Sequence, residues 1–187
     1  RHDCSQVTDG AAGVVLVSER SGRRPGSHIL GWGHRTVGLG LDAKLAGADE
    51  LVMPHVAATV RDAFGRAGVA GVSQIDGIET HDCFTPSEYM AIDHFGITPP
   101  GRSWQAVASG AIAMDGVIPI NPSGGLIGVG HPVGATGVRM VLDAHKQVTG
   151  GAGDYQVAGA RRFATLNIGG STATTVSFVV GAPELTD

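Results

Sequence analysis

The stretch from Asn121 to Gly137 combines residue types that catalysis needs with a spacing that suits a ligand site. Its six glycines let the backbone approach a ligand closely and adopt positive φ. His131 stands in the middle, and Pro132 directly after it restricts the local geometry. A segment with helical periodicity, residues 138–148, follows at once. An imidazole on a stiff turn before a helix is typical of a catalytic loop. The alternative is a tight strand-to-helix connection with an incidental histidine.

A second candidate is the tetrad His81-Asp82-Cys83-Phe84, which follows an expected strand at 75–79 and precedes a helix start. Free N–H groups and the helix dipole at that position stabilise negative charge, which favours a thiolate at Cys83. His81 could add charge or a hydrogen bond. In the alternative interpretation, Cys83 is a small buried apolar residue and His81 a surface polar group.

A third candidate is Asn167-Ile168-Gly169-Gly170, a glycine-containing turn between two apolar segments. Its N–H groups could face an oxyanion, although an ordinary hairpin turn is the simpler interpretation. Open α/β sheets bind ligands where strands end and helices begin, a position that suits all three loops.

Composition excludes several function classes. The chain has 187 residues, of which 42% are apolar and 16% charged, and this predicts a globular protein with one sizeable core. A net charge of −4 offers no electrostatic footprint for nucleic acid. No apolar run reaches the roughly 18 residues of a membrane span. The two cysteines, Cys4 and Cys83, form no zinc spacing, so we expect no metal and a reducing cytoplasm.

The chain divides near residues 18–27. Before this point, Val14 to Val17 is a continuously apolar segment that predicts a buried strand without a visible partner, and Glu19 to Gly26 has the composition of a linker. Thr85-Pro86-Ser87-Glu88 predicts a capping box with proline in the first turn of a helix.

Alternating strand and helix patterns follow the linker and predict an α/β layered fold with a mostly central sheet. We expect strands at 28–32, 75–79, 163–166 and 173–180, and helices at 54–67, 85–95, 104–112 and 138–148.

These motifs resemble the thiolases, acyl-CoA acyltransferases that make or break a carbon–carbon bond by Claisen chemistry. Asn121 to Gly137 follows the family's C-terminal signature Asn-x-x-Gly-Gly-x-x-x-x-Gly-His-Pro-x-Gly-x-x-Gly, and Asp3 to Ala12 resembles the end of the N-terminal half. Most thiolases carry Asn-Glu-Ala-Phe where this chain has the tetrad beginning at His81. In carrying this tetrad, the chain resembles the sterol-carrier-protein-type subfamily.

The resemblance implies two similar βαβαβαββ halves, with a mixed central sheet flanked by helices, in a homodimer or homotetramer. Residues 1–26 would end the N-terminal half and form a linker, and residues 27–187 would be the C-terminal domain. The chain would then cover about half of a thiolase and need the N-terminal half as its partner.

The resemblance also assigns roles. His131 would take the proton from the acyl-accepting cysteine and, with His81, form an oxyanion hole for the thioester oxygen. Cys83 would be the general acid and base at the substrate α-carbon, because Asn167 stands where ordinary thiolases have a second cysteine. Gly169 would supply its N–H to a second oxyanion hole. Gly130 and Asn121 belong to the oxyanion and substrate-binding loops.

The implied activity is reversible Claisen condensation or thiolytic cleavage of 3-ketoacyl-CoA, as in fatty-acid β-oxidation, with coenzyme A and acyl-CoA as substrates and no bound cofactor. The covalent nucleophile would lie in the other half, since the surroundings of Cys4 match a different family position. Two alternatives stay open, a retro-aldolase or other carbon–carbon lyase and a non-catalytic acyl-CoA-binding subunit. Nucleotide binding through residues 128–130 fits poorly, because Pro132 and Val133 break the dinucleotide fingerprint.

Overall fold

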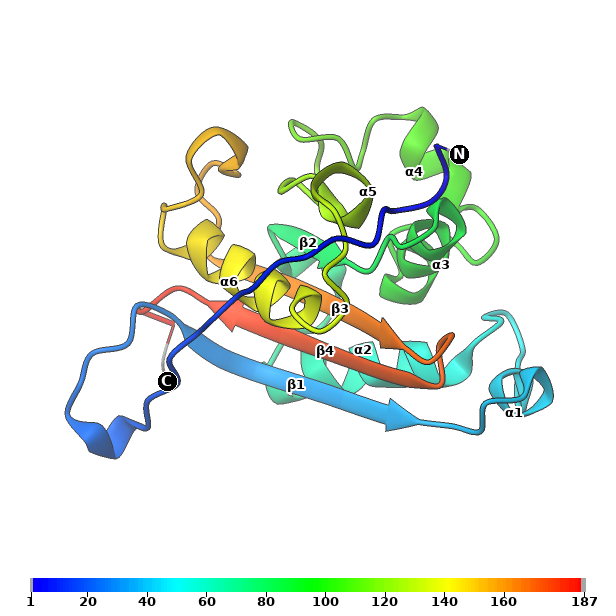
Figure 1. Ribbon diagram of the computed structural model, residues 1–187, viewed down its shortest axis with the longest axis horizontal. Coiled ribbons are helices and arrows are strands. Elements are labelled where there is room, and N and C mark those ends of the chain that lie inside the picture. Colours follow the sequence, from blue (N-terminus) through cyan, green and yellow to red (C-terminus); the bar gives the residue numbers. More distant parts are fainter. Residues whose placement is uncertain (1, 186–187) are drawn as a thin grey trace.

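The computed structural model describes residues 2–185, without the side chain of Glu19, and has a mixed four-stranded sheet with helices on both faces (Figure 1). The strand order is β1-β4-β3-β2. β4 is antiparallel to both of its neighbours, and β2 is parallel to β3. The strands are β1 (His28–Thr36), β2 (Gly77–Thr80), β3 (Arg162–Gly169) and β4 (Thr174–Gly181).

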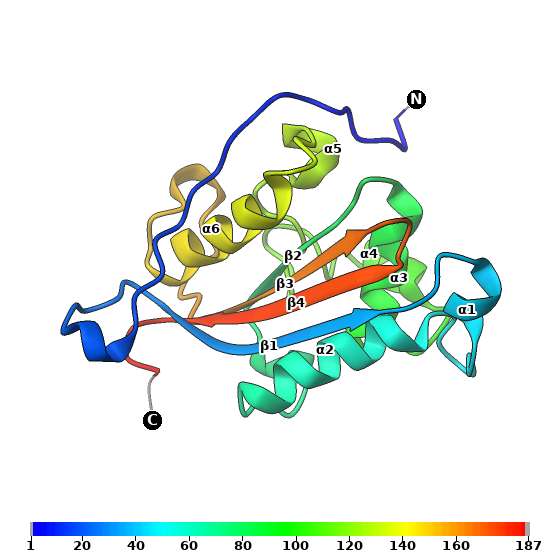
Figure 2. The ribbon, with the colours of Figure 1, turned by 60° about the horizontal axis from the view of Figure 1, so that its bottom comes forward.

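Helix α6 covers one face of the sheet and helix α2 the other, as Figure 2 shows. Helix α3 packs against both α2 and α4. The α-helices are α1 (Leu41–Leu45), α2 (Pro54–Arg66), α3 (Thr85–Phe95), α4 (Ser103–Ala108), α5 (Gly125–Val129) and α6 (Thr136–Val148). Three short 3-10 helices lie at Glu19–Ser21, Val72–Gln74 and Gly153–Tyr155.

The alternation of side chains along the strands divides the core between the two faces. In β3, Phe163 packs with α6, whereas Ala164 and Leu166 join the larger core formed with α2 and α3. In β2, Ile78 belongs to that larger core. The same period of two therefore turns Glu79, and His81 just beyond the strand, toward the α6 face.

The expected α/β fold with a mixed central sheet flanked by helices is confirmed, with one strand reduced to a single contact. A βαβαβαββ unit has five strands, and the position after α4 is occupied only by an isolated parallel bridge between Ile78 and Ile120. Helices α2 and α3 occupy the expected ranges. Helix α3 ends at Gly96, whose φ of 74° is left-handed and typical of a helix C-terminus.

Some local predictions were wrong. Residues 14–17 form no strand; they run as an extended segment on the surface, with Val15 86% exposed. Thr85 does not cap α3, because Phe84 is the N-cap residue and makes no side-chain cap bond. Helix α4 ends at Ala108, short of the expected residue 112. Residues 167–169 lie inside β3, and the turn follows them.

Helix α6 presents a different face to the sheet from the one that its apolar pattern suggests. Val138, Val141 and Leu142 are only partly buried and line two cavities, which they share with residues of β1, β3 and β4. The buried face carries Thr136, Met140, Asp143, Ala144, Gln147 and Val148. Ala144 and Val148 of this face pack with Phe163 and Val180 of the sheet, and Asp143 lies close enough to the buried Glu79 to affect its pKa.

Candidate active site

Two histidines from loops fifty residues apart meet at the site. The rings of His81 and His131 lie with centroids 4.9 Å apart and planes at 86°. His81 directly follows β2, and its N–H donates to the carbonyl of Leu166 in β3. His131 lies in the turn between α5 and α6. Both residues are buried.

Both imidazoles are neutral at neutral pH. Burial and, to a smaller extent, the adjacent His131 together lower the pKa of His81 to about 4. Burial also lowers the pKa of His131; the Asp82 carboxylate opposes this effect and Arg139 adds to it. A neutral imidazole can both accept a proton and donate an N–H bond, which general-base catalysis and oxyanion binding require.

Thr136 holds the ring of His131. Its Oγ1 lies 2.7 Å from His131 Nδ1 and donates its own proton to the carbonyl of Pro132, 3.1 Å away. Since the Thr136 hydroxyl has one proton and donates it to Pro132, the hydrogen bond between Thr136 and His131 requires a proton on Nδ1. Nε2 then keeps its lone pair and can act as a base.

Cys83 lies two residues after His81, just before α3 begins. It is a free thiol of intermediate exposure, and its Sγ lies 3.7 Å from the hydroxyl of Ser87 in the first turn of α3. The expected position of this thiol at a helix start is confirmed. Its side chain is not among those that line the cavity beside His81.

A cavity of about 480 Å³ brings His81 together with Asn167 and Gly169 of β3. Asn167 faces α6 because it alternates with Leu166, and its Nδ2 lies 2.8 Å from Met140 Sδ. Gly169 is exposed at the end of the strand. Val14 and Leu16 of the N-terminal segment also line this cavity, which is mostly apolar.

Asn121 and Gly130 shape the loops. The Asn121 side chain accepts the N–H of Thr80 at 2.7 Å and donates to Glu88 at 3.4 Å, so both of its polar atoms bind protein. Gly130 has a φ of 102°, and a Cβ there would meet the side chain of Thr8 at 2.8 Å. This close approach and positive φ explain the glycine.

Residues 3–8 tie the two histidine loops together. The N–H of Ser5 donates to the carbonyl of Cys83, and the carbonyl of Gln6 accepts the N–H of His131, each at 2.9 Å. Asp3 contributes a further bond, because its carbonyl accepts the N–H of Thr85. Figure 2 shows this segment passing over α5.

Sequence reasoning missed a buried polar network beneath the loop of residues 121–137. Glu79 is fully buried and accepts both the N–H and the hydroxyl of Ser123, at 3.1 and 2.7 Å. Arg139 donates to Ser123 and pairs with Asp143 at 2.8 Å. Burial raises the pKa of Glu79 to about 7. The alternation along β2 is the signal that could have found Glu79.

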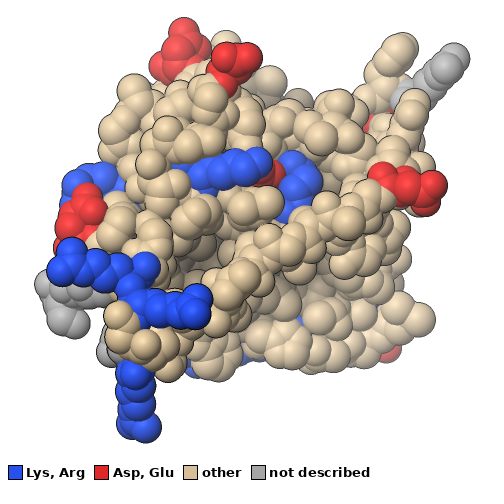
Figure 3. Space-filling model, turned by 60° about the vertical axis from the view of Figure 1, so that its left-hand side comes forward, with Lys and Arg blue, Asp and Glu red and all other residues tan. Residues whose placement is uncertain are grey.

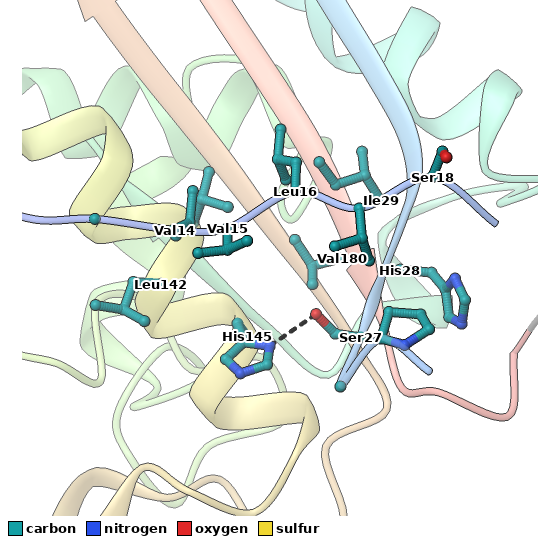
Figure 4. Close-up of a pocket in the computed structure, with 15 residues that line it drawn as sticks. Val14, Val15, Leu16, Ser18, Ser27, His28, Ile29, Leu142, His145 and Val180 are labelled. Carbon is teal, nitrogen blue, oxygen red and sulfur yellow. Dashed lines mark hydrogen bonds between the residues drawn. The ribbon is translucent and has the colours of Figure 1, made fainter. Parts of the chain in front are cut away.

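A larger cavity of about 680 Å³ lies between the N-terminal segment, the start of β1 and α6. In Figure 4, the segment from Val14 to Leu16 crosses this cavity, and His145 forms a 2.8 Å hydrogen bond with Ser27. Figure 3 views the side on which residues 18–27 lie and shows Lys and Arg gathered beside a mostly uncharged face. The cavity walls are largely aliphatic.

Among residues 2–185, no three His, Cys, Asp or Glu side chains gather as a metal site would require. Within the same range, no helix is both long and apolar enough to cross a membrane.

Comparisons with known proteins give a consistent result. Residues 42–182 match the protein family described as "Thiolase C-terminal domain-like". The chain is 36% identical over 179 residues to an acetyl-CoA acetyltransferase of Methanothermobacter thermautotrophicus, which covers 92% of this chain and 45% of that protein. It is 31% identical over 188 residues to sterol carrier protein 2 of Homo sapiens, covering 97% and 34%.

A solved structure titled "Ltp2-ChsH2(DUF35) aldolase" superimposes with a TM-score of 0.72 over 87% of this chain and 41% of its own, at 19% identity. At this identity the likeness establishes the fold alone. The chain spans less than half the length of these two curated relatives.

Proposed function

Since the chain belongs to the thiolase C-terminal domain-like family, we propose that it supplies the acid–base and oxyanion half of an acyl-CoA acyltransferase site. The perpendicular pair of neutral histidines carries the proposal, because it joins a base to a hydrogen-bond donor in a buried place. The reaction is reversible Claisen condensation or thiolytic cleavage of a 3-ketoacyl-CoA. Coenzyme A and acyl-CoA are substrates, and no bound cofactor takes part.

In the first step a cysteine of the preceding half attacks the thioester carbonyl. His131 Nε2 accepts the thiol proton, the new carbon–sulfur bond forms, and the bond to coenzyme A breaks. The leaving thiolate takes the proton from His131. His81 stabilises the oxyanion of the tetrahedral intermediate. Its buried position and low pKa suit this role, because they keep the ring neutral and away from water.

In the second step the sulfur of Cys83 accepts a proton from the α-carbon of an acyl-CoA, and the carbanion attacks the acyl-enzyme. The carbon–carbon bond forms as the carbon–sulfur bond to the nucleophilic cysteine breaks, and the departing thiolate recovers the proton that Cys83 took. The N–H of Gly169 stabilises the enolate oxygen. Asn167 sits beside Gly169 and cannot exchange a proton at this pH, which leaves the proton transfer to Cys83.

The surrounding assembly is part of the same proposal. Residues 1–26 end the preceding half and residues 27–187 form the C-terminal domain. The complete enzyme is a homodimer or homotetramer that acts in fatty-acid β-oxidation. The free thiols of Cys4 and Cys83 support a reducing compartment, the cytoplasm.

The test uses the complete protein with acetoacetyl-CoA and free coenzyme A. We expect loss of acetoacetyl-CoA, formation of acetyl-CoA, and an acetylated cysteine peptide outside residues 1–187 in mass spectra of the quenched enzyme. Carbon–carbon cleavage without any acyl-enzyme would overturn the proposal in favour of a retro-aldolase. Thioester binding without turnover would indicate a non-catalytic acyl-CoA-binding subunit.

A further inference from the structure

Asp82 lies between His81 and Cys83 in the sequence, yet its side chain forms hydrogen bonds with the loop of residues 121–137. Asp82 is 3% exposed, and its carboxylate accepts the N–H of Leu126 at 2.6 Å and that of Ile127 at 3.4 Å. Both donors lie in the first turn of α5, where backbone N–H groups have no partner within the helix. Asp82 therefore caps from a distance the helix that leads to His131.

The two glycines that precede this turn are shaped to the carboxylate. Gly124 and Gly125 have φ values of 98° and 61°, which L side chains rarely adopt. A Cβ on Gly125 would lie 2.7 Å from Asp82 Oδ1 and 2.8 Å from Cγ, and closer still to Oδ2. The backbone wraps around Asp82 so tightly that no side chain fits between them.

We propose that Asp82 is a positioning residue that couples the loop of residues 81–84 to the turn carrying His131, and so sets the distance between the proton-transfer groups. The inference rests on the proposed function for its effect on turnover. Its structural content rests on the contacts of the carboxylate alone.

Asp82 affects His131 through its charge as well as through its hydrogen bonds. The carboxylate favours the protonated form of His131, whereas Arg139 on α6 disfavours it. Glu88 of α3 is the other carboxyl that interacts with Asp82. Removing the charge should therefore lower the His131 pKa, an effect that loss of packing alone does not produce.

The decisive variant is Asp82→Asn in the complete protein, because it keeps the side-chain volume and removes the charge. Asp76→Asn is the matched control, since Asp76 also accepts two backbone N–H groups, those of Arg161 and Arg162 at 2.7 and 2.8 Å. Amide hydrogen exchange of the peptide spanning 125–131 and exchange of the His131 ring hydrogen with pH, both by mass spectrometry, need no turnover.

We expect amide exchange in residues 125–131 to rise about tenfold in Asp82→Asn, the size of losing a charge-assisted bond. The His131 pKa should fall and kcat should drop with KM changed less than about twofold. Asp76→Asn should alter none of these. Unchanged exchange and unchanged His131 pKa would overturn the inference, even if the enzyme proved active. Should Asp82→Asn not fold, Gly125→Ala breaks the same contact from the other side, and unchanged exchange there would equally overturn it.

Discussion

The ring of His81 meets the ring of His131 edge to face, at 4.9 Å between centroids and 86° between planes. His81 directly follows strand β2, and His131 lies in the turn before α6. Thr136 fixes the second ring, and burial keeps both uncharged. The pair defines the place where thioester chemistry is proposed, and most of the following predictions start from it.

Replacing His131 should stop the reaction at its first step. With both a base and an oxyanion donor lost, His131→Ala in the complete protein should lower acyl-enzyme formation by roughly 10²-fold or more for each role. Quenched-flow mass spectrometry with acetyl-CoA measures this directly. His34→Ala, at an exposed histidine of β1, is the control and should acylate normally. Normal acylation of His131→Ala would leave His131 a structural residue.

Replacing Cys83 should stop the reaction one step later. Cys83→Ala should still form the acyl-enzyme but lose α-proton exchange and carbon–carbon bond formation, because the thiol that moves the proton is gone. Exchange of deuterium into acetyl-CoA and condensation assays report the two losses. Cys4→Ala removes the neighbouring exposed thiol and should leave both activities intact. Full turnover in Cys83→Ala would refute the assignment.

Thr136→Val should alter the protonation of His131 rather than its packing. Without the hydroxyl that binds Nδ1, the ring loses its preferred tautomer, and acylation should slow about tenfold or more, the size of one lost hydrogen bond. Nitrogen chemical shifts of His131 identify the tautomer. Thr136→Ser keeps the hydroxyl and should restore both the shifts and the rate. Equal rates in the two variants would contradict this role.

Glu79 should make stability depend on pH. Its pKa in the folded protein is raised from 4.5 to about 7, chiefly by burial. The stabilisation is therefore fully present below the unfolded pKa and lost as pH rises through 7, by about 3 kcal/mol. Urea unfolding of the complete protein between pH 4 and 8 measures the slope. Glu79→Gln should flatten it, whereas Glu50→Gln, at an exposed carboxyl, should not. An unchanged slope in Glu79→Gln would contradict the prediction.

Residues 1–187 expressed alone should associate and show no thiolase activity. Val15 and Leu16 are 86% and 73% exposed, and with Val133 at 65% they add apolar surface around the two cavities beside α6. Light scattering gives the mass in solution, and acetoacetyl-CoA cleavage gives the activity. Supplying the preceding half should restore both solubility and turnover. A soluble, active monomer would contradict the division into halves.

Local chemistry made much of the fold predictable from sequence. Helix α3 begins and ends where expected, because Pro86 suits the first turn and a glycine at position 96 easily adopts the left-handed conformation that ends the helix. The glycine-rich run around His131 and the tetrad around Cys83 could be identified as candidate loops for the same reason. Their residue types restrict the backbone over a few positions.

Tertiary structure decided which of these groups meet. The local sequence does not predict that His81 contacts His131 or that Asp82 caps a helix 44 positions later. Strand pairing and helix packing bring these residues together. The failure at Val14 to Val17 has the same cause, since an apolar run becomes a strand only where another strand offers hydrogen bonds. The sequence alone thus determined the local chemistry of each loop. Only the packing of α6 on the sheet decided how the loops combine into a site.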